Sequence, residues 1–105
     1  MLRIYDDMLH AIGTMRPVIK AIAREDGDLA NQLRRAASSV ALNLAEGSGS
    51  FGGVRRSRYR TALGSARETL ACLQTAQAFG YVGRIDETLL QDMHRVIGTL
   101  VRVAV

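Results

Sequence analysis

The stretch from Gln32 to Glu68 constrains the fold of this chain most, because it contains two helical patterns separated by a break rich in glycine and serine. The apolar residues of the first pattern recur at spacings of three and four, at Leu29, Leu33, Ala36, Val40 and Leu44. This spacing places them on one face of a helix and excludes a strand. The break, residues 47–53, disfavours a helix because glycine loses the most backbone entropy there, and its glycines suit a positive-φ cap.

A second apolar stripe follows the break and again has helical spacing, at Ala62, Leu63, Ala66, Leu70 and Leu73. The segment therefore predicts an antiparallel hairpin of two helices, residues 28–46 and 54–79, with the second ending at Gly80. Asp28 is the expected N-cap of the first of these helices. The small residues 64–66 predict that a neighbouring helix approaches closely.

Two further helices are expected to pack around this hairpin. Residues 2–24 have an amphipathic period, and Pro17 leaves two alternatives: one helix with Pro17 on its solvent side, or two shorter helices that break at Arg16. The second added helix has its apolar stripe between Ile85 and Leu100. With 48% hydrophobic residues but only 5% aromatic ones and no Trp, the core must be mostly aliphatic, as in helix packing. We predict a single all-α domain over residues 1–105.

Some apolar residues fall outside these predicted core stripes. Leu42 points away from the stripe of its helix, and Leu90 and Val101 widen the stripe of the last helix beyond what one bundle needs to bury. Extended apolar surface of this kind favours contact between subunits. Leu42, Leu90 and Val101 are therefore our candidates for the subunit interface of a homo-oligomer.

The charge of the chain favours an anionic partner. Its formal net charge is +4, and Lys20 is the only lysine among 14 basic residues. Because the planar guanidinium of arginine pairs with phosphate or carboxylate through two hydrogen bonds, the bias fits either nucleic-acid binding or ion pairs between subunits. A general replacement of lysine by arginine explains it equally well.

Seven arginines in and around the hairpin are candidates for nucleic-acid contacts: Arg34, Arg35, Arg55, Arg56, Arg58, Arg60 and Arg67. Helical angles place Arg56, Arg60 and Arg67 on one flank of their helix as a basic ridge, and Arg58 on the other flank. The alternative is structural ion pairing. If the hairpin turns near residue 50, Arg35 faces Glu68, and Glu46 faces Arg55 or Arg56.

No pattern in the chain points to catalysis, a cofactor or a metal. His10 and His94 stand alone, without a second ligand at metal spacing, and both are expected at the surface or its edge. The glycines of the break lack the lysine and the preceding strand of a phosphate-binding P-loop. Arginines beside the start of a helix still point weakly to nucleic acid, because free backbone amides there bind phosphate. We predict a protein that is not an enzyme.

The location is predicted from cysteine content and hydropathy. Cys72 is the only cysteine, which suits a reducing compartment. Asp6 and Asp7 interrupt the apolar pattern at the N-terminus, unlike a signal peptide, and no apolar run reaches the length of a membrane span. A soluble, cytoplasmic protein without a membrane partner is expected.

Three segments of the chain resemble a known family. They are Leu33-Arg34-Arg35-Ala36, Asn43-Leu44-Ala45-Glu46-Gly47 and Ala62-Leu63-Gly64-Ser65-Ala66-Arg67-Glu68, within a match over residues 28–81. The match is to the four-helix-bundle proteins encoded in intervening sequences of 23S ribosomal RNA genes, whose relatives include the accessory protein of diversity-generating retroelements. The resemblance implies an up-down-up-down four-helix bundle in a ring-shaped homo-oligomer, favouring a homopentamer, with a basic surface. In the retroelement relatives that surface binds nucleic acid and a reverse transcriptase.

Two functional hypotheses follow from the sequence. The first is an oligomer that binds RNA or DNA through the seven arginines, mainly at the backbone, because Tyr59 is the only aromatic residue among them to stack on bases. The second is a scaffold that recruits a protein partner such as a reverse transcriptase and uses its arginines in ion pairs. The number of arginines matched by carboxylates separates the two.

Overall fold

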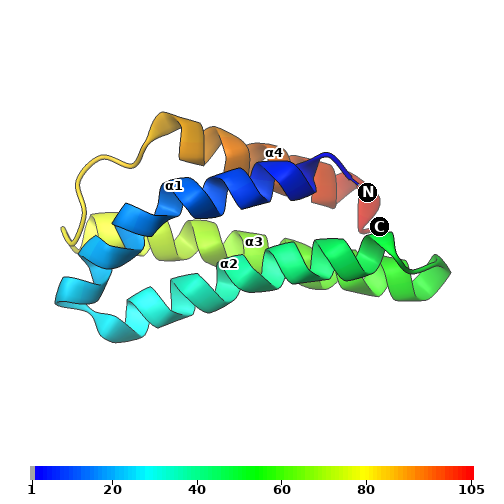
Figure 1. Ribbon diagram of the computed structural model, residues 1–105, viewed down its shortest axis with the longest axis horizontal. Coiled ribbons are helices and arrows are strands. Elements are labelled where there is room, and N and C mark those ends of the chain that lie inside the picture. Colours follow the sequence, from blue (N-terminus) through cyan, green and yellow to red (C-terminus); the bar gives the residue numbers. More distant parts are fainter. Residues whose placement is uncertain (1) are drawn as a thin grey trace.

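The computed structural model describes residues 2–105 and contains four helices and no strand within them. The helices are α1 (Ile4–Glu25), α2 (Gly27–Ser48), α3 (Gly52–Ala78) and α4 (Glu87–Val103). They run alternately up and down a bundle about 42 Å long, and both termini lie at the same end (Figure 1). Each helix packs against two others, and the contact between α2 and α3 is the most extensive. The predicted all-α four-helix fold is confirmed.

The core contains the apolar stripes that helical spacing predicted. Met8, Met15 and Ile22 of α1 are fully buried, as are Leu33, Val40 and Leu44 of α2. The stripes of the other two helices meet them from α3 and α4, with fully buried Ala62, Ala66, Leu73, Leu89, Met93, Val96 and Leu100. The interior is therefore almost wholly aliphatic. Thr69 lies fully buried among these residues and donates its hydroxyl to the Ser65 carbonyl oxygen at 2.8 Å, which satisfies it.

Helix α1 is continuous through Pro17, so the first of the two alternatives for this segment is confirmed. Pro17 is exposed. The backbone carbonyl oxygen that loses its hydrogen bond because proline has no N–H therefore does not lie in the core. The cap of α2 differs from the prediction. Asp26, one turn before the first buried leucine, accepts a hydrogen bond from the Leu29 amide at 3.0 Å, whereas Asp28 lies inside the helix.

The end of α2 and the position of the positive-φ glycine both differ from the prediction. Helix α2 continues through Gly47 to Ser48, so the connection is only residues 49–51. The positive φ of 55° occurs at Gly52, where α3 begins, and not at the end of α2. Gly80, with φ 77°, ends α3 as predicted, and the Tyr81 amide donates to the Ala76 carbonyl oxygen in a Schellman cap.

Gly47 lets α2 and α3 approach closely. A Cβ atom at this position would lie 2.4 Å from Cε1 of Tyr59, and Tyr59 is itself buried. Further along the hairpin, the Ser65 hydroxyl donates to the Ser39 hydroxyl at 2.7 Å. The predicted close approach at residues 64–66 is thus present at Ser65 and Ala66. Gly64 is exposed, with open space around it, and takes no part in it.

Helices α1 and α4 are joined by a charged network that sequence patterns did not reveal. The Asp92 carboxylate is buried, and its Oδ2 lies 2.6 Å from Nδ1 of His10. Its other oxygen accepts from Arg95, whose Nε is also 3.6 Å from Asp7. His10 is exposed, as predicted, yet it binds a buried residue. Pairing from two sides offsets the cost of burying this carboxylate.

We expect Gly47→Ala to destabilise the protein although alanine is the better helix former. The added methyl group overlaps the buried Tyr59 ring, and overpacking of this kind typically costs about 1–3 kcal/mol. Gly64→Ala is the matched control, because its methyl group meets open space and should stabilise α3 by about 0.5–1 kcal/mol. Chemical denaturation of both variants measures the difference. A Gly47→Ala protein as stable as the Gly64→Ala protein would contradict this account of the α2–α3 contact.

Candidate nucleic-acid interface

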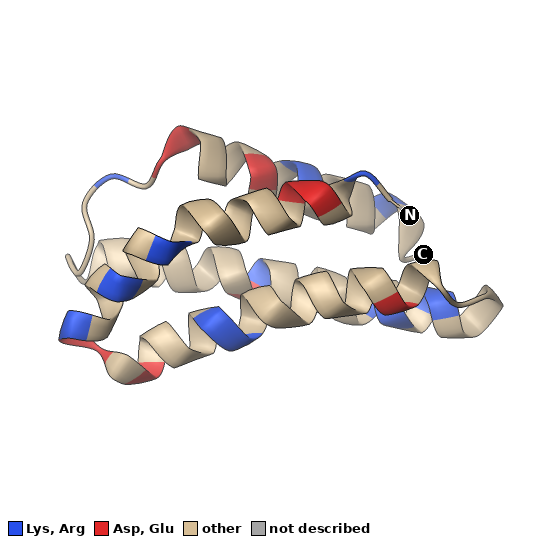
Figure 2. Ribbon diagram, viewed as in Figure 1, with Lys and Arg blue, Asp and Glu red and all other residues tan. Residues whose placement is uncertain are grey.

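Helix α3 directs its arginines to two sides of the bundle. On the α2 side, Nη2 of Arg58 lies 3.0 Å from Oε2 of Glu46. On the α4 side, Nε of Arg60 donates to the Ala104 carbonyl oxygen at 3.0 Å. Arg56 and Arg67 are exposed and share the flank of Arg60 by helical angle, as predicted. Figure 2 shows basic bands along the part of α3 that adjoins the turn from α2.

The two ion pairs predicted between the hairpin helices do not form. Glu46 pairs with Arg58 and not with Arg55 or Arg56, because the short connection and the Ser39–Ser65 contact move the register by about two residues. Arg55 instead donates from Nε to the carbonyl oxygens of Gly47 and Ser50, at 3.2 and 2.9 Å. Arg35 and Glu68 make no ion pair within 4.0 Å.

The seven candidate arginines are therefore mostly unmatched by acids. Within residues 2–105, Arg58 is the one that pairs with a carboxylate. Arg34 donates to the Asn31 side chain at 3.2 Å, and Arg55 and Arg60 donate to carbonyl oxygens, so all three keep their charge unneutralised. The remaining three, Arg35, Arg56 and Arg67, are exposed and make no hydrogen bond or ion pair with the described residues. A surface of this kind retains an attraction for anions.

A groove beside α2 combines three of these arginines with an exposed leucine. Its volume is about 470 Å³, and it is lined by Arg34, Arg35, Ser38, Ser39, Leu42, Asn43, Glu46 and Arg58. The Leu42 side chain is 65% exposed in this groove. Asn43 and Glu46 hold the Arg58 guanidinium at one end. Sequence patterns predicted different roles for Leu42 and these arginines, but the fold brings them together.

The other candidates for a subunit interface differ in exposure. Val101 on α4 is 45% exposed, as is Leu9 on α1, which the sequence analysis did not select. Leu90 is only partly exposed and packs against the core of its own bundle. Leu42 and Val101 therefore present more apolar surface than Leu90.

The aromatic residues near the arginines also differ from expectation. Tyr59 is buried against Gly47 and is not available to stack on a base. Phe51, at the tip of the hairpin, is 82% exposed, and the Arg55 guanidinium lies 5.7 Å from its ring centroid. Phe51 is thus the exposed aromatic ring beside the arginines, in place of Tyr59.

Two basic residues outside the seven candidates lie next to Arg34. Arg16 and Lys20 of α1 line a second, smaller groove together with Ile19 and Arg34. Their spacing of four residues places them on one face of α1, which was a visible signal. Their position beside α2, however, depends on how the two helices pack.

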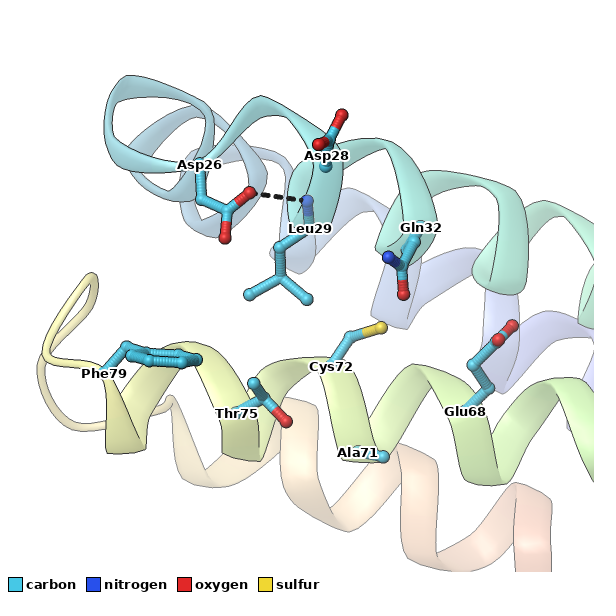
Figure 3. Close-up of a pocket in the computed structure, with 9 residues that line it drawn as sticks. All are labelled: Asp26, Asp28, Leu29, Gln32, Glu68, Ala71, Cys72, Thr75 and Phe79. Carbon is cyan, nitrogen blue, oxygen red and sulfur yellow. Dashed lines mark hydrogen bonds between the residues drawn. The ribbon is translucent and has the colours of Figure 1, made fainter.

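An acidic groove lies between α2 and α3 near the turn from α1 (Figure 3). It has a volume of about 430 Å³, and its lining includes Asp26, Asp28, Gln32, Glu68 and Cys72. Burial raises the pKa of the Cys72 thiol above its ordinary value, and the negative charge of Glu68 raises it further. A thiol in this state is mostly protonated at neutral pH and is a poor nucleophile. No group of three or more metal-ligating side chains occurs within residues 2–105.

The comparisons with known proteins agree with the fold. A family model described as the 23S rRNA-intervening sequence protein matches residues 3–102. The chain belongs to this family. A crystal structure from Bacteroides thetaiotaomicron, described as a protein of unknown function from the S23 ribosomal protein family, superposes with a TM-score of 0.82. The two chains are 20% identical over 96% of this chain and 97% of the other, a likeness that shows the fold alone.

No curated protein matches the chain. Within the part that the structure describes, no helix is long and apolar enough to cross a membrane.

We expect Cys72 to react slowly with iodoacetamide at pH 8.5, because its raised pKa leaves less thiolate than a free cysteine has at that pH. Glu68→Gln should speed the reaction modestly, since it removes the smaller of the two causes, and burial should keep the variant slower than free cysteine. Alkylation rates followed by mass spectrometry test both statements. A wild-type rate equal to that of free cysteine would show that the thiol is neither buried nor shifted.

Proposed function

We propose that this protein is a non-enzymatic homo-oligomer that binds the phosphate backbone of RNA or DNA through its exposed arginines. The main support for the proposal is that few of the arginines are neutralised. Among the described residues, only one of the seven candidate arginines forms an ion pair with a carboxylate. Positive charges held on helices α2 and α3 and left unneutralised favour a polyanion. The family description names an rRNA intervening sequence, which makes RNA the first nucleic acid to test.

The two sides of α3 have different roles in this proposal, one in subunit contact and the other in nucleic-acid binding. The α2 side carries Leu42 in a groove, and there the Arg58 charge is already paired with Glu46. That side suits contact between subunits, and a ring-shaped homopentamer is the favoured assembly. The α4 side carries the ridge of Arg56, Arg60 and Arg67, where no carboxylate lies within 4.0 Å of a guanidinium among the described residues. That side suits nucleic acid.

The contacts on this surface should be poor in sequence specificity. Arginine bonds to phosphate position a protein on nucleic acid but carry no base information. Among residues 2–105, Phe51 is the exposed ring beside one of the candidate arginines, Arg55. The proposal also includes a reducing, cytoplasmic location, which rests on the single cysteine.

A scaffold that recruits a protein partner is the second candidate. The exposed apolar side chains of Phe51, at 82%, and Val54, at 60%, favour it, because they lie together at the hairpin tip. Kinship with the accessory protein of diversity-generating retroelements would make a reverse transcriptase one such partner. If the scaffold hypothesis is correct, replacing Arg56, Arg60 and Arg67 will not change the affinity for nucleic acid, because these arginines do not contact it.

We expect Leu42→Glu to dissociate the oligomer or make it insoluble while most helicity remains, because it places a carboxylate in an apolar contact between subunits. Val105→Glu, at a terminal position that is 81% exposed, is the control and should leave assembly unchanged. Light scattering and circular dichroism measure the two effects. A wild-type protein with the monomer mass of 11.4 kDa at micromolar concentration would contradict the oligomer, and an unchanged assembly in Leu42→Glu would remove Leu42 from the interface.

We expect replacement of Arg56, Arg60 and Arg67 together by Gln to weaken nucleic-acid binding and leave the fold nearly intact, since surface charge contacts contribute roughly 0–1 kcal/mol each. Each lost phosphate contact should lower the slope of log affinity against log salt by about 0.7 on single strands and about 0.9 on duplex DNA. The triple variant should therefore lose roughly two to three units per subunit engaged. Fluorescence anisotropy with labelled RNA and DNA over a salt series measures the slope.

The control for the ridge removes the same charge elsewhere, through Arg3→Gln, Arg24→Gln and Arg84→Gln. These three exposed arginines line none of the grooves described above. An equal loss in both triple variants would mean that net charge, and not the ridge, determines binding. No binding of wild type at low salt would move the scaffold hypothesis ahead.

A further inference from the structure

The groove between α1 and α2 has three basic side chains among its four lining residues and lies apart from the α3 ridge. Arg16 and Lys20 contribute from α1, one helical turn apart, and Arg34 contributes from α2. Ile19 is the remaining lining residue, so no carboxylate lines the groove. Figure 2 shows the basic bands in the second half of α1 beside the basic band of α2.

This arrangement leaves positive charges close together without neutralisation. Neither Arg16 nor Lys20 has an acidic partner within 4.0 Å among residues 2–105. Like charges four residues apart on a helix repel each other, and Arg34 adds a third positive charge from the facing helix. The Asn31 side chain, which accepts a hydrogen bond from Arg34, is neutral and holds the guanidinium without removing its charge. An anion bound in the groove would relieve this repulsion.

The size of the groove suits a single phosphate group. Its volume is about 190 Å³, below the roughly 300–1,000 Å³ usual for sites that enclose a small molecule. An arginine fork together with a lysine ammonium provides the planar donors and the point charge that phosphate oxygens accept. Ile19 has no polar side-chain atom, so all side-chain hydrogen-bond donors in the groove belong to Arg16, Lys20 and Arg34.

The groove borders the surface assigned above to subunit contact. Arg34 lines both this groove and the Leu42 groove, so the α1–α2 groove lies beside that contact and on the opposite side of it from Arg58. We propose that the α1–α2 groove binds a backbone phosphate of the nucleic acid and so extends the binding surface beyond α3. This proposal rests on the proposed function and adds Arg16 and Lys20 to the residues that perform it.

The first test asks whether the groove binds phosphate, with sodium tripolyphosphate as the probe. Titration of ¹⁵N-labelled protein should shift the amide signals of residues 16, 18–20 and 34 more than those of the acidic groove. The double variant Arg16→Gln/Lys20→Gln should lose this response, and the control Arg84→Gln/Arg102→Gln should keep it. Both variants lose two positive charges from exposed positions, and light scattering confirms that assembly is unchanged. Equal responses in the two variants would overturn the site.

The second test asks whether the bound phosphate belongs to nucleic acid. With single-stranded RNA, Arg16→Gln/Lys20→Gln should lower the salt slope by about 0.7 relative to wild type for each subunit engaged, and with duplex DNA by about 0.9, since one phosphate contact is lost. The control variant should keep the wild-type slope on both.

The outcomes separate this proposal from the proposed function. If wild type binds nucleic acid and the double variant and the control have the same slope of log affinity against log salt, the groove proposal is wrong and the proposed role of the α3 ridge is unaffected. If wild type binds neither RNA nor DNA at low salt, both the groove proposal and the proposed function are wrong. Loss of slope in the double variant together with loss of the tripolyphosphate response supports the groove.

Discussion

The close packing of α2 against α3 is the contact on which the rest of the structure depends. It requires a residue without a side chain at Gly47, where the Tyr59 ring occupies the space of a Cβ atom, and two small hydroxyl residues at Ser39 and Ser65. Cores are packed as densely as organic crystals, so a single methyl group at such a point moves the helices. The pair α2–α3 then presents a continuous apolar face to α1 and α4, which close the bundle.

The same contact decides where the arginines point. Once Tyr59 is buried against Gly47, its neighbours Arg58 and Arg60 must project to opposite sides of α3, because successive helical residues are about 100° apart. Arg58 reaches Glu46 on α2, and Arg60 reaches the last turn of α4. One buried ring thus separates a surface with a paired arginine and an exposed leucine from a surface with unpaired arginines. The two tasks in the proposed function follow from this division.

The charge of the molecule is also unevenly distributed, which a net charge of +4 does not reveal. Acidic side chains gather where α2 begins and in the groove beside Cys72, while the basic groove of Arg16 and Lys20 lies on the other side of α2. The buried Asp92 has the His10 ring and the Arg95 guanidinium within hydrogen-bonding distance. Arg56, Arg60 and Arg67 on α3, and the α1–α2 groove, are therefore two regions where several positive charges gather without an ion-paired acid among the described residues.

The sequence by itself determined the helices and their buried faces, because a helix of 3.6 residues per turn makes apolar spacing a direct record of one face. Leu33, Val40, Leu44, Ala66 and Leu73 were all recognisable in this way, and so was the opposite placement of Arg58 and Arg60. Only the tertiary structure decided which side chains meet across helices. His10 and Asp92 are 82 residues apart in the chain, and Arg16 and Arg34 share a groove only because α1 packs beside α2. The Glu46–Arg58 pair depends on a register set by a three-residue connection and a glycine–tyrosine contact, and spacing along one helix carries no information about the residue that faces it.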